Sequence, residues 1–134
     1  MKHACRFALV LLTGLLLSCR PAQGHPHILH LEEQEDISFA ELLARVEDSR
    51  VIFMGETHDH PGHHQAQLAV IRALHQAGHQ VAIGLEMFRR RYQESLDRWV
   101  AGEISEQQFA RLFHQNWQWW PLYRPIFRYA RENG

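Results

Sequence analysis

The sequence is poor in lysine and carries almost no net charge. Lys2 is the only lysine among the 134 residues, and the formal net charge is −1. Without an excess of basic residues, nothing in the composition favours a nucleic acid as partner. The apolar stretch at residues 7–17 is too short for a membrane-spanning helix, which needs about 20 residues. The composition is therefore that of one globular domain of ordinary size.

Cysteine is also scarce, and the positions of the two cysteines bear on export and lipidation. Residues 1–18 join a basic start to an apolar stretch, which is typical of a signal peptide. The run Leu16-Leu17-Ser18-Cys19 resembles a bacterial lipobox, which implies cleavage before Cys19 and lipidation of that residue. Because Cys5 would leave with the signal peptide, the mature chain has no internal disulfide. We expect an exported protein held at a membrane through Cys19; the alternative is an ordinary cleaved signal with an incidental cysteine.

The remaining chain divides into a tether and a domain. Residues 19–37 are polar and contain two prolines and an acidic run, so we interpret them as a tether. The domain is expected at 38–134, where Ser38 and Glu41 form the sequence signature of a capping box at the start of a short helix.

Two apolar runs predict a parallel sheet. Residues 51–54 and 81–85 are each a short continuous apolar run, as expected for strands buried on both faces. Pro61 is well placed to open a helix between them, which gives a strand–helix–strand unit with a right-handed crossover. Further helices are expected at the ranges 89–101, 105–115 and 122–132. The predicted fold class is α/β, a parallel sheet flanked by helices. Since two strands make a very small sheet, we expect an incomplete N-terminal portion of a larger domain, truncated at its C-terminus.

Polar residues follow both predicted strands. Glu56 and His58 come directly after the first strand, and Glu86 follows the second. Ligands collect beyond the carboxyl ends of parallel strands, which lie about 4.8 Å apart. Two carboxylates and an imidazole at such a place are suited to a divalent metal or to general base catalysis. The alternative is that Glu56 caps the next helix and Glu86 is solvated.

Histidine is the residue present in unusual number. The chain has eleven, and six of them fall within 22 residues: His58, His60, His63, His64, His75 and His79. Neutral imidazole is a common ligand of metals, so this enrichment favours metal or cofactor binding over a set of solvated side chains. His75 and His79 lie at the far end of the predicted helix, and we expect both on the surface.

Three ordered motifs resemble one known family. They are Phe53-Met54-Gly55-Glu56-Thr57-His58-Asp59 with Gly62-His63-His64-Gln65, then Gly84-Leu85-Glu86-Met87-Phe88, then Trp117-Gln118-Trp119-Trp120 with Tyr123. This pattern resembles the ChaN-type haem-binding lipoproteins. The resemblance implies haem binding, a part in haem or iron uptake, anchoring at the outer membrane facing the periplasm, and a homodimer that shares haem.

The resemblance leaves the ligand of the haem iron open. An axial ligand is a residue such as His, Tyr, Met or Cys. The candidates are His58, His63, His64, Tyr92 and Tyr123. Met87 and Phe88 are expected in a core. The tryptophans at 117, 119 and 120 are expected to pack the last helix, the alternative being an apolar face for a porphyrin or a partner subunit.

Two other hypotheses remain. The Gly55-Glu56-Thr57-His58 segment also resembles a wider superfamily with erythromycin esterases and TIKI metalloproteases. In a metal-dependent hydrolase of that kind, Glu56, His58 and Glu86 would be the catalytic and metal-binding residues. Because the rest of such a site would come from further segments, an enzymatic activity is the less favoured hypothesis. The third hypothesis is a metal-binding protein that uses His60, His63 and His64.

Overall fold

The computed structural model describes residues 27–134. The predicted signal peptide, Cys19 and the first part of the tether lie outside the described residues. No helix within residues 27–134 has the length and apolar character needed to cross a membrane.

The chain begins with a small hairpin where the sequence suggested a tether. Strands β1 (Ile28–His30) and β2 (Glu35–Ile37) pair in antiparallel fashion, with Ile28 opposite Ile37. Gln34 closes the turn with a positive φ of 54°. Ile37 is the buried residue of the hairpin, which lies within the range predicted as a tether.

The first two helices agree with their sequence signals. Helix α1 (Phe39–Val46) opens with the predicted capping box, in which the Ser38 side chain accepts from the Glu41 backbone N–H at 3.2 Å. Helix α2 (Pro61–Gln76) has Pro61 in its first turn. It ends at Gln76, and Gly78 follows the C-cap residue with a φ of +94°, which glycine adopts readily.

The C-terminal part of the chain is helical. The predicted helix at 89–101 is a 3-10 turn, η1 (Arg90–Tyr92), followed directly by α3 (Gln93–Val100). Helix α4 (Glu106–Asn116) opens with the predicted Ser105 and Gln108 capping box. Helix α5 (Trp120–Asn133) begins two residues before its predicted start.

The core lies among these three helices and is mostly aromatic. Its buried members are Met87, Trp99, Phe109, Phe113, Trp120, Tyr123 and Phe127. The Trp99 indole N–H donates to the Phe127 carbonyl at 2.9 Å, so this buried polar group has a partner. The expectation that Met87 belongs to a core is confirmed.

The prediction of a parallel sheet is wrong. Residues 51–54 and 81–85 form no strand, and the two segments do not pair with each other. They line a groove of about 920 Å³ together with one face of α2, and Phe53 is 94% exposed. Parallel strands are stable when neighbouring strands and helices cover them on both sides. Within residues 27–134 no neighbouring strand pairs with either apolar run, so neither run forms part of a sheet.

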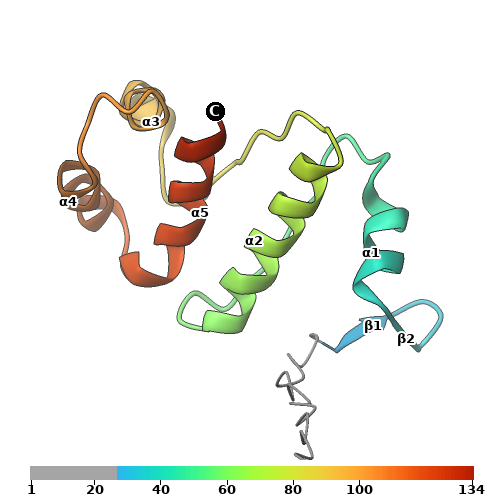
Figure 1. Cartoon of the computed structure of the whole chain (residues 1–134). Coiled ribbons are helices and arrows are strands. Elements are labelled where there is room, and N and C mark those ends of the chain that lie inside the picture. Colours follow the sequence, from blue (N-terminus) through green and yellow to red (C-terminus); the bar gives the residue numbers. More distant parts are fainter. Residues whose placement is uncertain (1–26) are drawn as a thin grey trace, which may run out of the picture.

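The elements follow one another across the molecule. Figure 1 shows the hairpin and α1 at one end, α2 in the middle, and α3, α4 and α5 grouped at the other end. Helix α2 contacts both α1 and α5. The loop before α2 and the start of α5 thereby come together, and the candidate site lies there.

Candidate functional site

The carboxylate of Glu56 is the centre of a group of side chains from three parts of the chain. Glu56 follows the first extended segment, and its side chain is only 12% exposed. One oxygen, Oε1, accepts a hydrogen bond from the Tyr123 hydroxyl and lies 3.0 Å from Nδ1 of His58. The other oxygen, Oε2, lies 3.0 Å from Nδ1 of His64. The predicted site residues Glu56, His58, His64 and Tyr123 are thus adjacent.

The contact with Glu56 determines which nitrogen of His58 carries a proton. An ionised carboxylate can only accept hydrogen bonds, so Nδ1 of His58 is the donor. In the neutral ring, Nε2 then has a free lone pair, and no residue from 27 to 134 hydrogen-bonds to it. A carboxylate behind one nitrogen is the usual way of orienting a histidine that binds metal through the other.

His64 is buried behind this pair and is 3% exposed. Its Nε2 lies 2.9 Å from the His58 carbonyl oxygen, which can only accept, so Nε2 is the donor. Its Nδ1 is within ion-pair distance of Glu56 Oε2, but the two buried atoms are not aligned for a hydrogen bond. We therefore treat this contact as electrostatic only, favourable when Nδ1 is protonated. Both ring nitrogens face protein groups, and this leaves neither for a ligand.

Tyr123 connects the group to the loop before α5. The Trp117 indole N–H donates to the Tyr123 hydroxyl at 3.2 Å, and that hydroxyl donates to Glu56. The His64 and Tyr123 rings are also in contact, with centroids 4.3 Å apart. A continuous chain of hydrogen bonds therefore runs from Trp117 through Tyr123 and Glu56 to His58.

These contacts shift the acidity of two members of the group. Burial alone would raise the pKa of Glu56, but hydrogen bonds from Tyr123 and His58 outweigh it and hold the pKa below its usual value. Burial, together with the hydrogen bond to Glu56, raises the pKa of Tyr123 to about 12. Glu56 is therefore the charged partner and Tyr123 stays a neutral phenol, which disfavours Tyr123 as a phenolate ligand.

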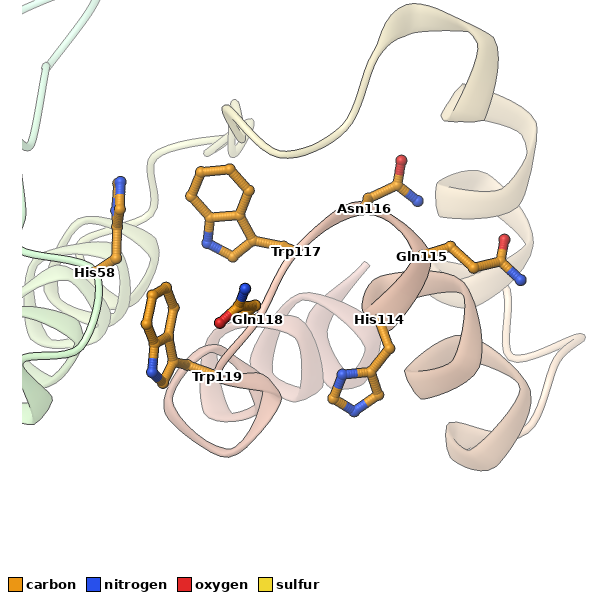
Figure 2. Close-up of a pocket in the computed structure, with 7 residues that line it drawn as sticks. All are labelled: His58, His114, Gln115, Asn116, Trp117, Gln118 and Trp119. Atoms are coloured by element: carbon orange, nitrogen blue, oxygen red, sulfur yellow. The ribbon is translucent and has the colours of Figure 1, made fainter.

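A cavity opens beside His58. It has a volume of about 370 Å³, within the usual range of about 300–1,000 Å³ for small-molecule sites. Figure 2 shows its lining residues, of which His58 comes from the loop before α2 and the others from the end of α4 and the loop between α4 and α5. They are His58, His114, Gln115, Asn116, Trp117, Gln118 and Trp119. The larger groove along α2 contains Glu56 but no imidazole of this group, so we place the candidate site at the smaller cavity.

Aromatic rings flank His58 in this cavity. Its ring meets Trp117 edge-on, with centroids 4.9 Å apart and planes 78° apart. Trp119 lies further away, at 6.3 Å and 31°. The His58 side chain is nevertheless 40% exposed, so its free nitrogen is accessible. Of the tryptophans that were expected to pack the last helix, Trp120 belongs to the core and Trp117 packs against that core while also lining the cavity. Trp119 lines the cavity and is not part of the core.

The other predicted site residues lie elsewhere. His63 accepts a hydrogen bond from the Thr57 backbone N–H at 2.8 Å and stacks on His60, which makes it part of the loop structure. Glu86 is exposed and lines the α2 groove with Glu56. Tyr92 lies outside the cavity lining, with its hydroxyl 3.2 Å from Arg91. Its pKa is lowered, mainly by that hydrogen bond, so Tyr92 remains a second candidate for a phenolate ligand.

Several residues at the cavity were not predicted from the sequence. His114, Gln115 and Asn116 line it, but they belong to no motif and sit at the end of α4, where the sequence shows only a helix ending. Gln118, which also lines it, lies within the third motif but was not named as a site residue. Their proximity to His58 follows from the packing of α5 on α2. His75, expected on the surface, is half-buried and hydrogen-bonded to Tyr129 at 2.8 Å.

Among residues 27–134, no group of three or more His, Cys, Asp or Glu side chains is arranged to hold a metal ion. Glu56, His58 and Glu86 do not converge as the parallel sheet predicted, because the two extended segments that carry them are not paired. The geometry therefore gives no support to a divalent metal site at these residues.

Fold and site together define a mixed α/β domain with a carboxylate-oriented histidine at an aromatic cavity. A family model described as "Haem-binding uptake, Tiki superfamily, ChaN" matches residues 42–134, more than two thirds of the chain. The chain belongs to this haem-binding family. No curated protein and no solved structure matches it.

Proposed function

We propose that this protein binds haem in the cavity beside His58, with His58 as the axial ligand, and serves haem or iron uptake at the cell envelope. The observation that supports this most directly is the His58–Glu56 contact of 3.0 Å. It engages Nδ1 and leaves Nε2 without a partner among residues 27–134, and His58 lines a cavity together with Trp117 and Trp119. When bound, haem supplies an iron that accepts an axial nitrogen ligand.

Glu56 acts as a positioning residue in this proposal. A carboxylate behind a ligating histidine fixes the ring orientation and makes the ligating nitrogen more basic. Tyr123 and His64 in turn hold Glu56 from two other directions. The charge on Glu56 is retained because its pKa is lowered, so the orientation of His58 is maintained at neutral pH.

The anchor belongs to the proposal as well. A lipid on Cys19 would hold the domain at the membrane surface through the chain that precedes β1. The proposed location is the periplasmic side of the outer membrane. Mass spectrometry of the membrane fraction tests this: a lipid-modified Cys19 supports it, and an unmodified cleaved chain contradicts it.

Hemin titration tests the haem proposal. The full chain with Cys19→Ser is titrated while the Soret band and the oligomeric state are followed together. We expect saturable binding, weakened at least about tenfold by His58→Ala, with a changed Soret position because the axial ligand is lost. His79→Ala is the matched control, since His79 is exposed and lies beyond the far end of α2. A shift in size on loading would support a homodimer that shares haem.

The outcomes distinguish a wrong assignment of the iron ligand from a failure of the proposed haem binding. A wild-type chain without a Soret shift contradicts haem binding altogether. Binding that survives His58→Ala but is lost in Tyr92→Phe keeps the function and assigns the iron to Tyr92. His114→Ala tests the other histidine that lines the cavity: binding that survives His58→Ala but is lost in His114→Ala assigns the iron to His114. Glu56→Gln should broaden or shift the Soret band, and His58→Ala should remove that effect if Glu56 acts through His58.

A further inference from the structure

Trp119 has an unusual backbone conformation. Its φ and ψ are 57° and 37°, in the left-handed region. Between residues 27 and 134, Gln34 is the other non-glycine residue with positive φ. The left-handed conformation is unfavourable for L-amino acids, and it is a genuine outlier for a bulky side chain.

The fold gains little from a tryptophan at this position. Trp119 is 40% exposed, whereas the next residue, Trp120, is 8% exposed and belongs to the core. Trp119 is also the N-cap of α5, but its side chain makes no capping hydrogen bond. Glycine or asparagine would suit both the backbone conformation and the cap position better. Core packing therefore does not account for the indole.

The Trp119 indole lies at the cavity and not in the core. The conformation of Trp119 directs its indole toward His58, with ring centroids 6.3 Å apart. Figure 2 shows the two rings at the same side of the cavity, Trp119 coming from the loop that precedes α5. Strained residues occur where the surrounding structure holds a side chain for function.

We propose that Trp119 is a ligand-contact residue, held in a strained conformation so that its indole packs against the flat ring system of a porphyrin. This rests on the proposed function for the identity of the ligand, but not on which residue ligates the iron. The contact is with the macrocycle, so it should be made equally by a porphyrin that contains no metal.

Two probes and three variants test the proposal in the full chain with Cys19→Ser. The probes are hemin and metal-free protoporphyrin IX. Trp119→Gly should raise the unfolding temperature, because glycine accepts the backbone conformation, and should weaken binding of both probes about fivefold to tenfold. Trp119→Phe should keep most of the affinity. Gln34→Gly is the matched control, since it relieves the other positive φ and should leave both affinities unchanged.

Each outcome of these measurements supports or contradicts a specific part of the proposal. A lower unfolding temperature for Trp119→Gly would show that the indole stabilises the fold, which overturns the proposal without reference to any ligand. A stable Trp119→Gly that binds protoporphyrin IX as tightly as the wild type overturns it too. If His58→Ala leaves hemin binding unchanged while Trp119→Gly weakens protoporphyrin IX, the axial ligand is wrong and the role of Trp119 stands. A wild type that binds neither probe contradicts both proposals.

Discussion

The Tyr123 hydroxyl donates a hydrogen bond to the Glu56 carboxylate across 67 positions of the sequence. This bond joins the first turn of α5 to the loop before α2 and forms beside the buried ring of His64. A hydrogen bond to a charged group contributes about 1.5–3 kcal/mol when it is shielded from water. The same contact therefore serves the stability of the domain and the geometry of the candidate site.

Tyr123→Phe should accordingly lower the free energy of unfolding by about 1.5–3 kcal/mol. It removes the donor to Glu56 and the acceptor of the Trp117 indole N–H. Urea denaturation followed by circular dichroism measures the change. Tyr92→Phe serves as the control, because its hydroxyl accepts from Arg91 in an exposed hydrogen bond, and it should stay within about 0.5 kcal/mol of the wild type. Equal midpoints for the two variants would contradict the importance of the Tyr123–Glu56 bond.

The tyrosines should ionise in separate steps. The chain has three, and burial with the Glu56 hydrogen bond raises the pKa of Tyr123 to about 12, above its usual value of 10. The hydrogen bond from Arg91 lowers the pKa of Tyr92. Because the folded pKa of Tyr123 is raised, its contribution to stability is complete below pH 10 and is lost as the pH rises toward 12. Tyrosinate absorbance should show a late step that disappears in Tyr123→Phe; a single step near pH 10 for all three would contradict this.

The end of α2 offers a test of backbone conformation alone. Gly78 has a φ of +94°, and a methyl group added there would meet nothing within 4 Å. Gly78→Ala should therefore cost only the strain of the left-handed conformation, about 1–2 kcal/mol of unfolding free energy. Gly84 also has open space around it but no positive φ, so Gly84→Ala is the control and should be neutral. Thermal unfolding compares the two, and a neutral Gly78→Ala would mean that the helix ends differently.

Local signals in the sequence predicted the helices well. Ser38 and Ser105 each begin a capping box that the structure contains, and Pro61 opens α2. These signals depend on residues within one turn of each other, so a short stretch of sequence determines them. The closeness of Glu56 and His58 follows from the same local spacing, two residues apart in the chain.

Distant contacts could not be predicted in this way. Nothing near Tyr123 in the sequence indicates that its hydroxyl meets Glu56, and nothing near Trp119 indicates a left-handed residue beside His58. Both depend on how α5 packs against α2. The parallel sheet was predicted from two apolar runs. Such a run indicates that a segment is suited to burial, but it does not indicate whether a neighbouring strand is present. The two apolar runs therefore do not form the predicted strands within residues 27–134.

Phe53 tests this difference directly. In a paired, covered strand its side chain would be buried, and Phe53→Ala would cost about 3–5 kcal/mol, as for other large core residues. In the structure it is 94% exposed at the groove along α2, so the substitution should change the free energy of unfolding by no more than about 0.5 kcal/mol. Loss of this exposed apolar ring should also increase solubility, which light scattering measures.

Phe113→Ala is the matched control for Phe53→Ala. The Phe113 side chain is fully buried in the aromatic core, so its removal should cost about 3–5 kcal/mol in the same denaturation experiment. If both phenylalanines prove equally costly, the segment 51–54 is covered in solution by polypeptide that packs on the groove, and the groove is closed. If only Phe113 is costly, the extended segments stand apart as the structure has them. In either case the hydrogen bonds of the candidate site, from His58 and from Tyr123 to Glu56, do not involve Phe53.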